Sequence, residues 1–200
     1  MVEIDRLKKP IGKQDQYAAA YGSLNFMTFN PDGSVHVEPV PYKPETLREI
    51  ESRTLLLYTA QQRSADDILI KQSAGTKEKD KFNILCQMRD LATEMKSVIS
   101  SSSDNSIDEF ARLLHQGWLL KKSLGFGISN SSIDQWYEAA IAAGAQGGKL
   151  LGAGGGGFLL LIAPPQRHQA IRDALGNPRE LPFEIDCRGS RIIFISDRYR

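Results

Sequence analysis

The sequence has no long hydrophobic run, which argues against a membrane-spanning helix. A transmembrane helix requires about 20 consecutive apolar residues, whereas the longest candidate, Phe158–Ala163, has six. The N-terminal residues MVEIDRLKKP are charged and contain no apolar segment of the kind that a secretory signal requires. We therefore expect a cytoplasmic protein that does not insert into membranes.

An excess of one charge sign and a cysteine framework are also absent. The chain has 25 Lys and Arg against 24 Asp and Glu, a net charge of +1, so it has no bulk attraction for nucleic acids or anionic membranes. Its two cysteines, Cys86 and Cys187, lie far apart, and neither has a Cys or His neighbour at metal-ligand spacing. This pattern predicts reduced thiols rather than a disulfide or a zinc site.

The first fifty residues have too few apolar side chains to form a core of their own. Residues 24–29 and 34–40 have strand character, and the connector Asn30-Pro31-Asp32-Gly33 has the residues of a tight turn, which predicts a hairpin. A hairpin alone is marginally stable in water. Closely spaced prolines follow it. We therefore predict that residues 1–50 are the remnant of an N-terminal domain and that residues 51–200 form a second domain.

From Arg53 onward the pattern is that of an α+β domain, with helices on one face of a mostly antiparallel sheet. Ser106 with Glu109, and Ser132 with Gln135, have the spacing of a capping box and predict two helix starts. The predicted strands cover residues 53–59, 147–151, 158–163, 181–185 and 191–196, and the other predicted helices cover residues 64–72, 76–99 and 165–175.

A run of glycines between two predicted strands is the most conspicuous motif. Gly152, Gly154 and Gly157 satisfy GxGxxG, the dinucleotide-binding fingerprint, and Asp173 lies where the ribose-binding acid would be sought. We reject this interpretation because the fingerprint requires a helix after the loop, and the apolar run FLLLIA follows instead. Two interpretations stay open. The loop is either a bend that needs positive φ and close packing, or a backbone surface that closely approaches a ligand or another loop.

Two charged positions are candidates for chemistry. Asp15, in GKQDQ, has Lys13 two residues away, and a nearby ammonium group would keep the carboxylate ionised and ready to accept a proton. Arg63 lies between a strand end and a helix start, where it could bind a phosphate together with the free N–H groups of the helix. An exposed aspartate and a solvated arginine are the alternatives.

These segments together resemble the GHMP kinases. GGKLLGAGGGGFLLLIA is similar to the third, C-terminal motif of that superfamily, and GKQDQYAAAYG resembles the segment that carries the catalytic aspartate in its sugar-kinase branch. With RSADDIL and the ending SRIIFISDRYR, the chain is most similar to the D-glycero-D-manno-heptose 7-phosphate kinases. The resemblance covers essentially the whole chain.

The resemblance implies ATP-dependent phosphorylation, with Mg²⁺, of the anomeric hydroxyl of a sugar phosphate. Residues 51–200 would be the ferredoxin-like α+β C-terminal domain of the family, and residues 1–50 a remnant of its N-terminal domain. Asp15 would be the catalytic base, and Lys13 and Arg63 would contact the substrate. The loop glycines packed beside the triphosphate-binding loop would be Gly152, Gly154, Gly155, Gly156 and Gly157.

The chain also departs from the family. The ATP-binding loop of the form PxxxGLGSSAA does not occur in the sequence, and neither does the first family motif. We therefore expect a fragment, a degraded gene product or a misassigned start, with no robust turnover by the isolated chain. A non-catalytic remnant that binds a sugar phosphate or a partner is the alternative, as is another GHMP sugar kinase of fucokinase or galactokinase type. The uncovered apolar surface predicts a homodimer or a missing N-terminal half as partner.

Overall fold

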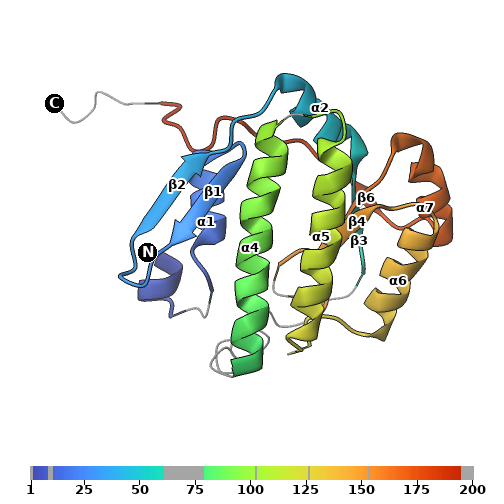
Figure 1. Cartoon of the computed structure of the whole chain (residues 1–200), viewed down its shortest axis with the longest axis horizontal. Coiled ribbons are helices and arrows are strands. Elements are labelled where there is room, and N and C mark those ends of the chain that lie inside the picture. Colours follow the sequence, from blue (N-terminus) through green and yellow to red (C-terminus); the bar gives the residue numbers. More distant parts are fainter. Residues whose placement is uncertain are drawn as a thin grey trace. The chain divides into compact units, whose positions relative to one another are not determined.

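The computed structural model describes residues 2–8, 11–60, 79–101, 103–125, 127–152 and 154–194 (Figure 1). The chain divides into two compact units, each built from two segments. The first unit contains Met1–Ile11 and Tyr42–Phe183, and the second contains Gly12–Pro41 and Glu184–Arg200. The predicted domain division between residues 50 and 51 stays a prediction.

The first unit is built on one four-stranded antiparallel sheet. Its strands are β3 (Thr54–Tyr58), β4 (Gly147–Leu150), β5 (Phe158–Ile162) and β6 (Glu180–Leu181), in the spatial order β4-β5-β3-β6. The helices between β3 and β4 form the first crossover, β4 and β5 form a hairpin, and α7 leads to β6. This succession and strand order are those of a ferredoxin-like fold. The predicted ferredoxin-like α+β class is therefore confirmed.

The described helices of the first unit, together with the sheet, form its core. They are α2 (Pro44–Arg53), α4 (Lys79–Ser101), α5 (Ser106–Ser123), α6 (Ser131–Ala142) and α7 (His168–Ala174), with a π-helical turn at Val2–Arg6 and a 3-10 turn at Pro165–Arg167. Helices α4 and α5 lie side by side, and α5 contacts β4 (Figure 1). None of the described helices is long and apolar enough to cross a membrane.

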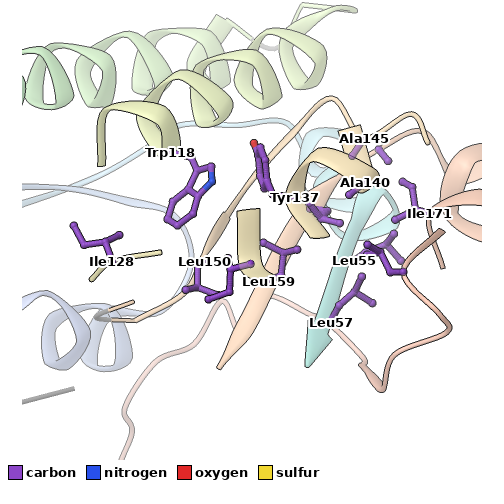
Figure 2. Close-up of a cluster of buried hydrophobic side chains, with 14 of the residues drawn as sticks. Leu55, Leu57, Trp118, Ile128, Tyr137, Ala140, Ala145, Leu150, Leu159 and Ile171 are labelled. Atoms are coloured by element: carbon purple, nitrogen blue, oxygen red, sulfur yellow. The ribbon is translucent and has the colours of Figure 1, made fainter. Parts of the chain in front are cut away.

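One hydrophobic cluster joins the sheet to its helices. Leu55 and Leu57 of β3 and Leu159 of β5 alternate with less buried neighbours, as expected for a sheet that buries one face more deeply. Trp118 of α5 and Tyr137 of α6 are the large aromatic members of the cluster (Figure 2). This packing holds the β4–β5 hairpin, and the glycine loop at its tip, against α5 and α6.

The second unit is small and nearly coreless. It contains α1 (Gln14–Tyr21) and the hairpin of β1 (Asn25–Phe29) with β2 (Val35–Pro39). The predicted hairpin is confirmed, and Gly33 adopts a φ of +83° in its turn. Among the described residues of this unit, Val40 is the only one that is buried.

The structure corrects the predicted helix caps. No side-chain hydrogen bond caps α5, whose N-cap residue is Asn105 rather than Ser106. Helix α6 is capped by Asn130, whose side-chain Oδ1 accepts a hydrogen bond from the Ile133 N–H at 3.1 Å, so the capping box predicted at Ser132 is wrong. The reason is that Asn is as good an N-cap as Ser, and three consecutive candidates compete at residues 130–132.

The predicted C-terminal strands are shorter than expected or absent. Only Glu180–Leu181 pairs as a strand in the region predicted at 181–185, and the described residues 191–194 form no strand. Their apolar pattern fits a strand, but a strand forms only where another backbone edge is available for pairing. The helix predicted at 64–72 and the start of the one predicted at 76–99 lie outside the described residues.

We predict that Gly147→Ala destabilises the first unit by about 1–3 kcal/mol, the usual cost of overpacking. A Cβ at this position would lie 1.9 Å from the carbonyl oxygen of Ala111, so α5 would have to move away from β4. Urea unfolding measures the change, with fluorescence reporting on Trp118 and Trp136.

The matched control is Gly117→Ala, a second glycine substitution that needs no positive φ. Its added Cβ would come no closer than 4.0 Å to the Leu91 side chain. Because Ala favours a helix over Gly by up to about 1 kcal/mol, this variant should be as stable as the parent or more so. Equal destabilisation by both variants would contradict the close contact at Gly147.

Candidate functional site

The glycine loop Gly152–Gly157 connects β4 to β5, and four of its glycines have a left-handed backbone. Gly152, Gly154, Gly155 and Gly157 have φ values of +73°, +111°, +74° and +99°. Residues with a Cβ rarely adopt these angles. The Leu151 N–H donates to the Phe158 carbonyl oxygen at 2.8 Å and closes the loop at its base. The requirement for positive φ that the glycine pattern predicted is therefore present.

Close packing restricts the centre of the loop. A Cβ on Gly154 would lie 2.6 Å from the carbonyl oxygen of Ile128, and the Gly155 N–H donates to that same oxygen at 2.9 Å. At the far end, the backbone N–H and the hydroxyl of Thr59 both donate to the Gly157 carbonyl oxygen at 2.9 Å. The loop is thus attached to the segment before α6 and to the end of β3.

The two ends of the loop are open. A Cβ on Gly152 or on Gly157 would meet no atom within 4 Å. Backbone angle, not crowding, therefore requires glycine at these positions. Such uncovered backbone could be approached by a ligand or by another loop, which is the second interpretation of the motif.

Lys121 is the charged side chain that the structure places at the start of the loop. Its Nζ donates to the carbonyl oxygen of Gly152 at 3.0 Å. Burial lowers the pKa of Lys121 to about 8, and the charge of Lys149 acts in the same direction. The neighbouring Lys122 donates instead to the carboxylate of Asp134 at 2.9 Å.

Sequence reasoning assigned both lysines only to the end of a helix, so it missed the contact of Lys121 with the loop. The doublet Lys121-Lys122 carries no sign of which ammonium group faces which partner. Beside them, between the end of α5 and the start of α6, lies a pocket of about 350 Å³ lined in part by Lys122, Ser129 and Asp134. Its volume is in the range of small-molecule sites.

Asp15 and Lys13 lie in the second unit, at the start of α1. Asp15 is exposed in the first turn of the helix, where a carboxylate interacts favourably with the helix dipole. Lys13 precedes the helix, and its Nζ donates to the carbonyl oxygen of Gly33 in the hairpin turn at 3.0 Å. Lys13 therefore links α1 to the hairpin as well as lying near Asp15 in sequence.

The predicted site residues do not all lie in one unit, and one of them is not described. Arg63 is outside the described residues. Asp15 and Lys13 belong to the second unit, and the glycine loop belongs to the first. Within the described part of the chain, no group of three or more His, Cys, Asp and Glu side chains could hold a metal ion. Cys86 and Cys187 form no disulfide.

The ferredoxin-like fold and the glycine loop between antiparallel strands define the class. The family described as GHMP kinases C terminal matches residues 95–179. The chain therefore carries the C-terminal domain of the GHMP kinases, and the predicted superfamily is confirmed.

The similar relatives include kinases of heptose phosphates. The chain is 32% identical over 176 residues to a D-glycero-alpha-D-manno-heptose 7-phosphate kinase of Campylobacter jejuni, a match that covers 86% of this chain and 51% of the relative. A solved heptose 1-phosphate kinase of B. thetaiotaomicron is 29% identical with a TM-score of 0.62, covering 94% of this chain and 50% of the other. A solved protein of C. jejuni described as a sugar kinase is 30% identical with a TM-score of 0.66, and the match covers 94% of this chain and 53% of the other. The chain thus spans about half the length of these relatives.

We predict that replacement of Lys121 alters how stability depends on pH. The folded chain holds the Lys121 pKa at about 8, below the ordinary 10.5. The unfolded chain therefore binds more protons between these two pH values, and the contribution of Lys121 to folding becomes more favourable as pH rises from 8 to 10. In Lys121→Met, the unfolding free energy should therefore rise less between pH 8 and 10 than in the parent. The measurement is urea unfolding at pH 7, 8, 9 and 10.

The control is Lys122→Met, in the next residue of the same helix. Because the Lys122 ammonium is paired with Asp134 rather than with the loop, this variant should keep the parental increase between pH 8 and 10. Identical pH profiles for the parent and Lys121→Met would contradict the claim that burial lowers the pKa of Lys121.

Proposed function

We propose that this chain provides the C-terminal part of an ATP-dependent kinase that phosphorylates D-glycero-D-manno-heptose 7-phosphate at its anomeric hydroxyl. The observation that carries the proposal is the 32% identity to a heptose 7-phosphate kinase across 86% of this chain, since this match extends beyond the family domain at residues 95–179. It therefore includes sequence outside the shared ferredoxin-like unit, where substrate preference can differ between family members.

In this proposal Asp15 is the catalytic base. Its carboxylate accepts the proton of the anomeric hydroxyl, the hydroxyl oxygen forms a bond to the γ-phosphorus of ATP, and the bond from that phosphorus to the ADP oxygen breaks. ADP leaves with the electron pair. The exposed position of Asp15 at the start of α1 leaves its carboxylate accessible to a sugar hydroxyl. Lys13 and Arg63 would provide positive charge for the sugar phosphate.

The glycine loop would support the nucleotide rather than perform chemistry. Its open ends at Gly152 and Gly157 can accept the backbone of a triphosphate-binding loop, while the contacts of Gly154 and Gly155 with Ile128 hold its centre. ATP and Mg²⁺ are the cofactors that the proposed reaction requires, because phosphoryl transfer depends on positioning and charge stabilisation. We assign no residue to Mg²⁺, since the described residues provide no acidic cluster for it.

The proposed partner is a polypeptide that carries the triphosphate-binding loop, either the N-terminal half of a longer chain or a separate molecule; a homodimer is the alternative. The lack of buried side chains in the second unit, where Val40 is the only described one, supports the need for a covering partner. We place the reaction in the cytoplasm, where cysteines such as Cys86 and Cys187 that form no disulfide are usual.

We predict that Asp15→Asn lowers kcat for heptose 7-phosphate by about 100-fold or more, the usual contribution of a general base. The KM for the sugar phosphate should change little, because an amide retains the size and the hydrogen-bonding oxygen of the carboxylate. ADP release is measured with the purified chain and with the longest in-frame product that contains it, using heptose 7-phosphate, unphosphorylated heptose, fucose and galactose.

The control is Asp32→Asn, which changes another exposed aspartate of the second unit, one whose carboxylate bonds to Ser34 in the hairpin turn. Its turnover should match that of the parent. Equal turnover by the Asp15 variant and the parent would rule out Asp15 as the base. Binding of heptose 7-phosphate without turnover in any of these proteins would identify a non-catalytic remnant, and a preference for fucose or galactose would assign a different substrate.

A further inference from the structure

Helix α1 has almost nothing of its own to keep it in place. It has eight residues and none of them is buried, and isolated helices of this length are marginal in water. Two of its side-chain contacts are aromatic: Tyr17 stacks on Tyr21 and meets the edge of Phe29, with ring centroids 6.3 Å apart in both pairs. Contacts made by the backbone of the helix therefore contribute to the position of Asp15.

A turn from the far end of the chain supplies such contacts. Residues Asp186–Ser190, which belong to the same unit, form a turn in which the Asp186 carboxylate accepts the Arg188 N–H at 2.8 Å. This turn bonds to the C-terminal end of α1 on both sides. The Ser190 N–H donates to the Ala20 carbonyl oxygen at 3.0 Å, and the Ser23 N–H donates to the Asp186 carbonyl oxygen at 2.7 Å.

Two glycines permit this approach. Gly22, directly after α1, and Gly189, within the turn, have φ values of +64° and +59°. A Cβ on Gly22 would lie 2.3 Å from the Gly189 nitrogen, and a Cβ on Gly189 would lie 2.4 Å from the Ala20 carbonyl oxygen. Both of these atoms are backbone, which cannot rotate away as the end of a side chain could. The two backbones thus touch where any other residue would separate them.

We propose that the turn Asp186–Ser190 is a clamp that positions α1, and that Gly189 is a positioning residue for Asp15. The clamp accepts the end of the helix opposite to Asp15 and satisfies the Ala20 carbonyl, one of the orphan acceptors at a helix C-terminus. Residues 186–190 thereby help to place a group about 170 positions earlier in the chain. The Ser190 hydroxyl also donates to the carbonyl oxygen of Ala19, across a separation of 171 positions. The role of Asp15 itself rests on the proposed function, whereas the clamp does not.

We predict that Gly189→Ala accelerates hydrogen exchange at the Ser23 and Ser190 amides by about tenfold or more. The added Cβ pushes the turn away from α1, which breaks the bond from Ser190 to the Ala20 carbonyl and the bond from Ser23 to the Asp186 carbonyl. The amides of β3 and β5 in the first unit should stay within about twofold of the parent. Exchange is followed residue by residue by NMR on the whole chain. Unchanged protection at Ser23 would overturn the clamp.

The matched control separates the close contact from the cost of a left-handed backbone. Gly176 has a φ of +76°, but a Cβ there would meet no atom within 4 Å. Asn tolerates left-handed angles better than other residues with a Cβ. Gly176→Asn should therefore leave the Ser23 amide as protected as in the parent, while Gly189→Asn should expose it as Gly189→Ala does. If the Ser23 amide in Gly189→Asn stayed as protected as in the parent, glycine would be needed at position 189 only for its backbone angle. The role of Gly189 as a packing contact would then be overturned.

The kinase assay tests whether the clamp serves Asp15. In Gly189→Ala, kcat should fall at least tenfold while the KM for ATP stays within about twofold, because Asp15 is displaced with α1 and the glycine loop is not. An equal kcat would overturn the positioning role even if exchange accelerates. If neither the chain nor the longest in-frame product that contains it shows turnover, the proposed function fails, and the exchange experiment still decides whether the clamp exists.

Discussion

Backbone-to-backbone contact, with no side chain between the partners, is the constraint on which the rest of the structure depends. In the first unit, Gly147 admits the carbonyl of Ala111 in α5, and Gly154 admits the backbone of Ile128. These two approaches set how far α5 and the segment before α6 lie from the β4–β5 hairpin. Once that distance is set, the Lys121 ammonium reaches the first carbonyl of the glycine loop, and the hydrophobic cluster around Leu57 fills the space that remains.

The same physical device recurs in the second unit, with a different purpose. Among its described residues only Val40 is buried, so hydrophobic packing contributes little to the position of α1. The backbone contact between Gly22 and Gly189 positions the helix instead. The hydrogen bonds beside this contact add to the effect, because hydrogen bonds between backbones are directional. A unit held in this way resists sliding but gains little free energy of folding, which is consistent with a surface that needs a partner.

The sequence could predict features that are encoded locally. Continuous apolar runs predicted β3 and β5, the turn Asn30–Gly33 predicted the hairpin, and a bend with positive φ was one of the two interpretations of the five glycines. It failed where several local choices were equivalent. Three successive cap residues precede Ile133, and in the structure Asn130 is the one whose side chain accepts the Ile133 N–H. Residues 191–194 have the composition of a strand, yet whether they pair depends on an edge elsewhere in the chain.

By itself, the sequence determined the α+β class, the identity of the glycine motif and the resemblance to the GHMP kinases, because each is carried by consecutive residues or by a short period. Only the tertiary structure decided that Lys121 rather than Lys122 faces the glycine loop, that Gly154 packs on Ile128, and that Gly189 touches Gly22. These are contacts between residues distant in sequence. A single chain carries no local record of them, since they arise only when the sheet and its helices bring separate segments to the same place.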